Sequence, residues 1–388
     1  MIVAAACDDC LRRTDLVGAL AGWLDIEWRK REAPARVLAL SDERLLDACG
    51  TLATRRRYDA FDPAAARAAI AAAGLSAVCR CDGAYPPHLS DLTDPPAVLH
   101  IAGDPEAVGL ADAVAVVGAR RATQYGLTVA HDIGRGLSAA GVSVVSGLAL
   151  GVDAAAHTGA LDGGTPPVAV LAGGSDRPYP ASKRHLYAAV REAGAVVSEM
   201  PPGLAIHRWA FIARNRLIAA LARVVVVVEA TERSGSLTTA DLGAELGRTV
   251  AAVPGRITCA TASGTNGLLR DGAALVRHVH DVLDALAELT GAQYEICGAP
   301  AALDPALRQM LEQIGAGHST LPMLVACGFD ARVVLTGLGE LESRGLVRRG
   351  SRTERRSAPR ARPARRGRGE RTPRRRAAGR WCRRRSRT

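Results

Sequence analysis

The stretch VAVVGARRATQYG, residues 114–126, passes from a short apolar run through a glycine turn into a helical pattern. The same order recurs along the middle of the chain. The further apolar runs are VSVV (142–145), VAVLA (168–172), AVVS (195–198), VVVVV (224–228) and TVAAV (249–253). Runs that are apolar on both faces, separated by room for one helix each, are typical of a parallel sheet covered on two sides. The sequence therefore predicts a doubly wound α/β domain, with ligands bound at the carboxyl ends of the strands.

Changes of pattern predict the remaining organisation. Residues 1–75 have helical periodicity, which favours a small helical domain. Two Pro-Pro pairs break residues 76–111, so we expect an irregular connector into a sheet domain at 112–290. Residues 291–303 are predicted to be a linker. Three short helical patterns over 304–350 favour a winged helix.

The net charge of +11 is concentrated in the C-terminal tail, residues 351–388. The tail has 17 arginines and two glutamates, whereas the preceding chain has 33 basic and 37 acidic residues. Its low complexity predicts disorder. Two interpretations remain open: a nucleic-acid-binding arm held by counterion release, or a peptide translated from G+C-rich DNA in an alternative frame. An anion site in the folded part must come from local geometry.

Composition and cysteine spacing bound the class of protein. The 388 residues, 48% of them apolar, can fill the cores of two or three domains. No apolar run is long enough to span a membrane and no secretory signal is present, so we expect a soluble cytoplasmic protein without membrane contact. Cys7 and Cys10 form a CxxC and Cys79 and Cys81 form a CxC, without a second pair at zinc-finger spacing. We therefore expect reduced structural thiols and no metal.

Loops after the first two predicted strands carry groups suited to anions. Gly118 permits a tight turn into a helix start, and Arg120 offers a fork of donors for phosphate oxygens. Ser146 and Gly147 end the second strand. The dinucleotide fingerprint GxGxxG and the P-loop GK[ST] are both absent, so we expect no nucleotide cofactor and no ATPase activity.

Two later loops extend this pattern. Lys183 lies in the first turn of a predicted helix, where a basic residue opposes the macrodipole and is either solvated or paired with an anion. Ser234, Gly235 and Ser236 follow the fifth run and offer hydroxyls and amides at another helix start. Four such loops at one edge of the sheet together indicate an anion-binding surface.

The segment HRWAFIARNRLIAAL, residues 207–221, interleaves aromatic and basic side chains. Its candidate binding residues are Trp209, Phe211, Arg214, Asn215 and Arg216. Phe211 also has the spacing of a core position. Rings that stack on bases and arginines that neutralise phosphates are what single-stranded nucleic acid requires.

Asp153 and His157 lie four residues apart in a predicted helix, a spacing that is compatible with acid–base catalysis. No exposed nucleophile with an activating partner lies nearby. We therefore expect His157 to pack within the fold and Asp153 to favour the helix dipole.

Taken in order, these motifs resemble the DNA-processing protein A (DprA/Smf) family over about residues 83–289. The resemblance rests on GARRATQYG, SGLALGVDAAAHTGAL, the YP of RPYPASKRHL, SEMPPG, ARNRLIAAL, EATERSGSLTTADLGAELGR, VPGRI and SGTNGLLRDGA. It implies an extended Rossmann-like domain with an N-terminal sterile-alpha-motif or helix-hairpin-helix-like domain and a C-terminal winged helix. It also implies a non-catalytic homodimer that binds single-stranded DNA, helps to load RecA and protects DNA during natural transformation.

The resemblance places Arg120, the Ser146–Gly147 pair, Lys183, residues 214–216 and residues 234–236 at the pocket of the family. We expect the arginines and Lys183 to contact phosphates while Phe211 or Trp209 stacks a base. Two other classes stay open. One is a nucleoside-monophosphate hydrolase with Glu199 or Glu229 as its catalytic carboxylate, and the other is a recombinase-recruiting scaffold whose tail supplies the DNA contact.

Overall fold

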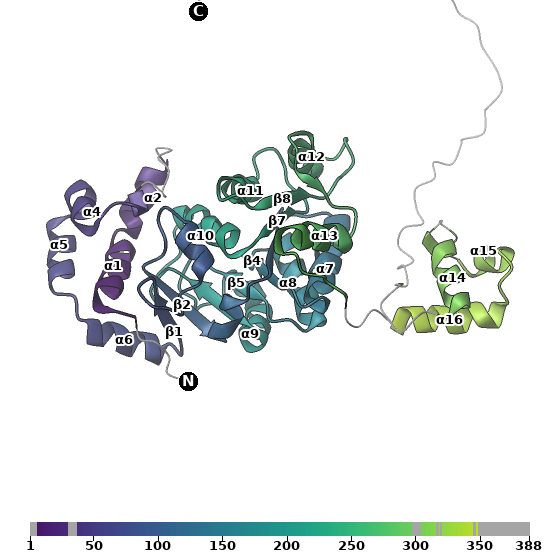
Figure 1. The fold of residues 1–388 in the computed structure, drawn as a ribbon, viewed down its shortest axis with the longest axis horizontal. Coiled ribbons are helices and arrows are strands. Elements are labelled where there is room, and N and C mark those ends of the chain that lie inside the picture. Colours follow the sequence, from purple (N-terminus) through teal and green to yellow (C-terminus); the bar gives the residue numbers. More distant parts are fainter. Residues whose placement is uncertain are drawn as a thin grey trace, which may run out of the picture. The chain divides into compact units, whose positions relative to one another are not determined.

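A computed structural model describes residues 6–29, 37–296, 304–315, 318, 320–343 and 347. The chain divides into two units, Met1–Ala299 and Pro300–Thr388, which are described separately. Figure 1 shows the first unit as a twisted sheet with helices on both faces and further helices beside one edge. The functional motifs quoted above lie in this unit.

The described strands of the first unit form one nine-stranded sheet in the order β1-β2-β6-β5-β4-β3-β7-β8-β9. Their bounds are β1 (Ser76–Cys79), β2 (Val98–Gly103), β3 (Ala113–Val117), β4 (Ser143–Ser146), β5 (Val168–Val170), β6 (Ala195–Ser198), β7 (Val224–Val227), β8 (Thr249–Ala252) and β9 (Ala274–Leu275). The strands β3 to β9 pair in parallel. All six predicted runs are strands, and the mainly parallel α/β prediction is confirmed.

Residues 76–111 are not the irregular connector that the prolines suggested. They hold β1 and β2, which pair with each other and then with β6 in antiparallel fashion. The prediction is wrong because the prolines fall outside the strands, in and around the 3₁₀ helix η1 (Pro87–Asp91). The apolar run of β2 is buried in nearly its full length.

Helices cover both faces of the sheet, and alternate side chains of each strand pack against the helices on opposite faces. They are α7 (Gln124–Ala139), α8 (Val152–Gly163), α9 (Arg184–Ala193), α10 (Arg208–Leu221), α11 (Gly235–Glu245), α12 (Ser263–Arg270) and α13 (Val279–Thr290). Val114 and Val116 pack with α7, α8 and α13, whereas Ala115 and Val117 pack with α10 and α11. Strands that are buried on both sides explain the continuous apolar runs.

The N-terminal region is helical, and its helices pack on the sheet unit. They are α1 (Asp8–Ala19), α2 (Ala21–Arg29), α4 (Asp42–Cys49), α5 (Leu52–Asp59) and α6 (Pro63–Ala72). Ser41, Thr51 and Asp62 accept hydrogen bonds from backbone N–H groups at the starts of α4, α5 and α6, which places these three boundaries. Assignment of the region to a sterile-alpha-motif or helix-hairpin-helix kind stays a prediction.

The second unit contains α14 (Pro305–Gly315), α15 (Leu321–Ala326) and α16 (Ala331–Ser343). They pack around a small core that includes Leu307, Met310 and Val334. Three helices agree with the three predicted patterns, but the expected wing falls largely outside the described residues, so the winged helix stays a prediction. The tail at 351–388 and part of the 291–303 linker also lie outside them. Among the described helices, none is long and apolar enough to cross a membrane.

Trp209 joins α10 to the N-terminal helices. Its side chain is 0% exposed, and its Nε1–H donates to the carbonyl of Ala21 at 2.9 Å. The carboxylate of Asp25 accepts from the backbone N–H of Arg208 at 2.8 Å and so caps the start of α10. The expectation that Trp209 stacks on a base is therefore wrong, because its ring is part of a core.

Replacing Trp209 with alanine should lower the free energy of unfolding by about 3–5 kcal/mol, since the change removes a fully buried ring and leaves a cavity. Urea unfolding followed by circular dichroism measures this value. Ile257→Ala is the control because Ile257 is 96% exposed, and it should change stability by no more than about 0.5 kcal/mol. Equal effects of the two substitutions would contradict the core role of Trp209.

Candidate functional site

A crevice opens where the strand order reverses. From β3 the chain proceeds to β4 on one side, and it later returns to β7 on the other side of β3. Ligands of open parallel sheets bind at such a switch point, beyond the carboxyl ends of the strands. The loops after β3, β4 and β7 therefore surround the candidate site.

Backbone contacts bring these loops close together. The N–H of Ala119 donates to the carbonyl of Glu229 at 2.7 Å, and the N–H of Val152 donates to the carbonyl of Ala119 at 3.2 Å. A Cβ at Gly118 would lie 2.8 Å from the Val152 side chain and 2.9 Å from the Glu229 carbonyl. Glycine at position 118 is therefore required for this close approach.

A pocket of about 230 Å³ lies in the crevice between the β3 loop, α10 and the start of α11. A smaller pocket of about 70 Å³ adjoins it, and Arg120, Ala149, Phe211 and Arg214 line both. The site thus extends over the loops after β3, β4 and β7, and Tyr179 and Pro180 of the loop after β5 line the smaller pocket. These are the four loops that the sequence pattern indicated.

Arg120 and Phe211 stack where the two pockets meet. The guanidinium carbon of Arg120 lies 4.9 Å from the centroid of the Phe211 ring, which is a cation–π geometry. The ring of Tyr179 lies 5.6 Å from the same ring. Arg120 and Tyr179 are exposed and Phe211 is half-buried, so the site presents a charge and a cluster of rings to solvent.

The start of α11 also lines the larger pocket. Ser234 caps this helix by accepting the N–H of Ser236, and the two hydroxyl groups lie 2.7 Å apart. The side-chain amide of Asn215 donates to the carbonyl of Gly235 at 3.1 Å. All four residues line the pocket. The N-terminus of a helix carries a partial positive charge, which attracts anions.

Arg214 lies beneath both pockets. Its guanidinium donates to the carbonyl of Gly147 at 2.8 Å and to that of Val170, and a Cβ at Gly147 would overlap it. Burial lowers the pKa of Arg214 to about 10, so the group remains charged at neutral pH. Burial also raises the pKa of the nearby Asp153 carboxyl, although the Arg214 charge opposes that shift.

Arg216 does not contact the pocket, so the expectation that it binds phosphate is wrong. Its buried guanidinium donates to the carboxylate of Asp94 at 2.8 Å and to that of Glu199 at 2.6 Å. Burial opposes the charge, but the Glu199 and Asp94 carboxylates outweigh it and hold the pKa of Arg216 above its ordinary value. Asp94 is 122 residues away in sequence, so the partner could not be found from the helix pattern.

Both carboxylates proposed for a hydrolase have structural partners. Glu199 pairs with Arg216. Glu229 accepts from the N–H and the hydroxyl of Thr123 at 2.8 and 2.6 Å and from the hydroxyl of Thr261 at 3.3 Å. Neither side chain lines the two pockets at the crevice.

The structure brings most of the predicted site residues together. Those that line the two pockets are Gly118, Arg120, Gly147, Phe211, Arg214, Asn215, Ser234, Gly235 and Ser236. Ser146 is buried and donates to the Val116 carbonyl at 2.6 Å, which joins β4 to β3. Lys183 ends the 3₁₀ helix η3 (Ala181–Lys183) and lines neither pocket. Sequence reasoning missed Tyr179, although the tyrosine belongs to a quoted motif.

The model of the family described as DNA recombination-mediator protein A matches residues 76–287. The chain belongs to this family. The match covers more than half of the chain, from β1 into α13, and it includes the whole pocket. The resemblance to DprA/Smf is confirmed.

Several curated relatives carry the family name. The putative DNA processing protein DprA of Mycobacterium tuberculosis is 45% identical over 240 residues, which are 61% of this chain and 62% of the relative. This chain therefore spans less than two thirds of that relative. DNA processing protein DprA of Bacillus subtilis is 33% identical over 238 residues, 61% of this chain and 80% of the relative.

Solved DprA structures have the same fold. DprA of Streptococcus pneumoniae has a TM-score of 0.59 and 30% identity over 73% of this chain and 98% of its own. DprA of Helicobacter pylori, described for its single-stranded DNA binding mode, has a TM-score of 0.51 and 29% identity over 55% of this chain and 96% of its own.

Arg216→Ala should lower the free energy of unfolding by about 3–5 kcal/mol, because it leaves two buried carboxylates without a partner. Urea denaturation is the measurement. Arg55→Ala is the control, since Arg55 pairs with Asp47 at an exposed position and should contribute about 0–1 kcal/mol. A stable Arg216→Ala protein would refute the structural role of Arg216.

Acid should destabilise the fold through His157, which lies fully buried in α8. Burial lowers the pKa of His157 from 6.5 to about 4. Between these values the unfolded chain binds a proton that the folded chain excludes, so stability is present above pH 6.5 and is lost as pH falls toward 4. The loss should be on the order of 2–3 kcal/mol.

Urea unfolding at neutral and mildly acidic pH measures this loss in the wild type and in His157→Leu. The substitution should reduce the pH dependence of stability. His100, which is also buried with a pKa lowered to about 4, should retain its own contribution in that variant. An unchanged pH dependence in His157→Leu would show that His157 does not titrate as described.

Proposed function

We propose that this chain binds single-stranded DNA in the crevice between β3 and β7. The observation that carries the proposal is the Arg120–Phe211 stack, which lines the same pocket as the N-terminus of α11. Family membership and the solved relative described for its single-stranded DNA binding mode support it.

Different residues of the site suit the phosphate and the base of a nucleotide. A phosphate near the α11 start would accept from the backbone N–H of Gly235 and from the Ser234 and Ser236 hydroxyls, while Arg120 adds a charged donor. A base would stack on the Phe211 and Tyr179 rings, as rings do at single-strand sites. Duplex DNA does not offer its base faces in this way, so the site should prefer single strands.

Arg214 supplies charge from below the pocket. The hydrogen bonds that the guanidinium donates to the carbonyls of Gly147 and Val170 hold it in place. Its Nε atom has no hydrogen-bond partner among the described residues. Because this charge is buried, salt screens it less than an exposed charge. We therefore expect phosphate contacts from Arg120 and Arg214 only. Lys183 and Arg216, which the sequence also suggested, do not line the pocket.

We further propose that the protein is a non-catalytic mediator of DNA uptake and recombination. It protects incoming single strands and helps to load RecA as a homodimer, with a winged helix at 304–350 and the tail as accessory parts. Family membership supports this role. A hydrolase is less well supported because Glu199 and Glu229 are both engaged in buried contacts. The scaffold alternative rests on the tail alone.

Arg120→Ala should weaken binding of labelled oligo-dT by roughly 10-fold, since a hydrogen bond to a charged group contributes about 1.5–3 kcal/mol. The loss should be similar for all sequences, and the slope of log K against log salt should fall by about 0.7 for the lost contact. Fluorescence anisotropy across a salt series, with a matched duplex, measures both quantities.

Arg55→Ala is the matched control, because it removes an arginine from α5 in the N-terminal region. Its affinity should equal that of the wild type. The same titration on residues 1–350 separates the pocket from the tail. Unchanged affinity in a folded Arg120→Ala protein, or loss of all binding without the tail, would overturn the pocket assignment.

A further inference from the structure

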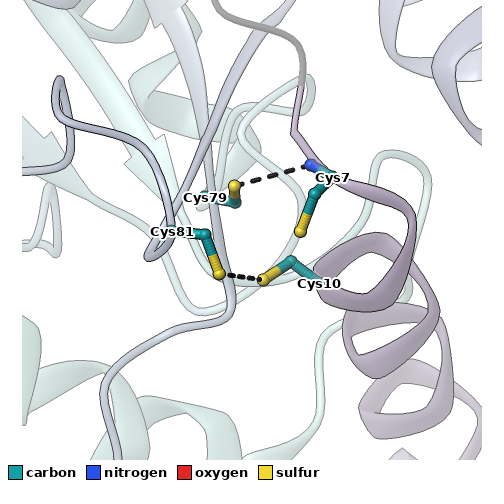
Figure 2. A group of neighbouring side chains, drawn as sticks. All are labelled: Cys7, Cys10, Cys79 and Cys81. Carbon is teal, nitrogen blue, oxygen red and sulfur yellow. Dashed lines mark hydrogen bonds between the residues drawn. The ribbon is translucent and has the colours of Figure 1, made fainter.

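Four cysteines from distant parts of the sequence meet beside the edge of the sheet. Cys7 precedes α1 and Cys10 lies in its first turn, while Cys79 ends β1 and Cys81 follows two residues later. Their sulfur atoms all lie within 4.8 Å of one another. Figure 2 shows the four side chains converging between α1 and the end of β1.

We propose that these four thiolates bind one Zn²⁺ ion. A tetrahedral ion with Zn–S bonds of about 2.3 Å separates its sulfur ligands by about 3.8 Å. The Sγ atoms of Cys10 and Cys81 are 3.7 Å apart. The spacing within each pair, two residues in the CxxC and one in the CxC, lets each segment supply two ligands to one ion.

Other uses of four cysteines fit this geometry less well. A disulfide needs sulfur atoms about 2.05 Å apart, and the structure has all four cysteines as free thiols. An iron–sulfur cluster distributes its thiolates over two or more iron atoms, which requires a wider sulfur arrangement than a single site. A sulfur-only tetrahedral set of this size favours one zinc ion.

The surroundings suit bound thiolates. The backbone N–H of Cys7 donates to the Sγ of Cys79 at 3.5 Å, and such donors stabilise negative sulfur. Cys10 and Cys79 are buried, whereas Cys81 is exposed. The site is therefore shielded on one side and open to an arriving ion on the other.

The ion would fasten the N-terminal helices to the sheet. Residues 7 and 79 are 72 positions apart, and the local core is a small cluster that includes Leu11, Ile70 and Val98. A small core gains much from a structural metal, because the binding free energy adds to folding. This site is separate from the proposed DNA pocket, and no residue lines both.

The test begins with the metal content of the full-length protein, as isolated or after incubation with zinc sulfate and desalting. Elemental analysis should find one zinc ion per chain. The double variant Cys10→Ser/Cys81→Ser should bind none, while Cys327→Ser, which changes a cysteine of the second unit, should keep it. Cys81→Ser alters an exposed ligand and should remain folded, with zinc affinity at least 10-fold weaker by chelator competition.

Cobalt gives a second measurement that does not depend on any variant. Co²⁺ in the wild-type protein should produce the visible bands and the sulfur-to-metal charge-transfer absorption of a tetrahedral thiolate site, and zinc should displace them. Hydrogen exchange in α1 and β1 should increase when a chelator removes the ion. Absence of bound zinc in the wild type, iron in its place, or zinc retained by the double variant would each overturn the proposal.

Discussion

The hydrogen bond between the Ala119 N–H and the Glu229 carbonyl, 2.7 Å long, holds together the loops on which the site depends. Glu229 acts twice, because its side chain also accepts from the N–H and hydroxyl of Thr123 at the start of α7. The absence of a Cβ at Gly118 permits the approach. Backbone contacts thus fix the shape of the crevice at the switch point and hold the elements that carry the pocket-lining side chains.

Helix α10 divides its side chains between this crevice and the core. Phe211 and Arg214 line the pocket, and Trp209 packs on the N-terminal helices in a cluster that Phe211 also contacts. Arg216 does neither, because its guanidinium forms buried ion pairs with the carboxylates of Asp94 and Glu199. A helix of 3.6 residues per turn presents different faces to different neighbours, so one Arg- and aromatic-rich segment lines the pocket and also packs in the core. The position of the N-terminal helices is therefore coupled to the pocket wall.

The sequence predicted what depends on local pattern and missed what depends on distant partners. The six buried strands were predictable because both faces of each run are apolar, and the loops after them followed from the topology rule. The residues around Arg216 in the sequence do not indicate that it pairs with Asp94. Those around Trp209 likewise do not indicate that its ring donates a hydrogen bond to Ala21. Both cysteine pairs were noted in the sequence, but their meeting was not predicted, because Cys10 and Cys81 are 71 positions apart and spacing rules describe ligands that are nearer in sequence. β2 was missed because the flanking prolines outweighed a short apolar run.

Charge at the pocket is a local property, because the chain before residue 351 is slightly acidic. Arg214 lies below the pocket and Arg120 beside it, while the buried Asp153 is the opposing group. Burial raises the pKa of Asp153, and the Arg214 charge opposes that shift. The Arg214 pKa, lowered only to about 10, keeps that arginine charged. Two guanidinium groups and one carboxyl thus line the same pocket, so the local balance of charged groups is opposite in sign to that of the slightly acidic chain before residue 351.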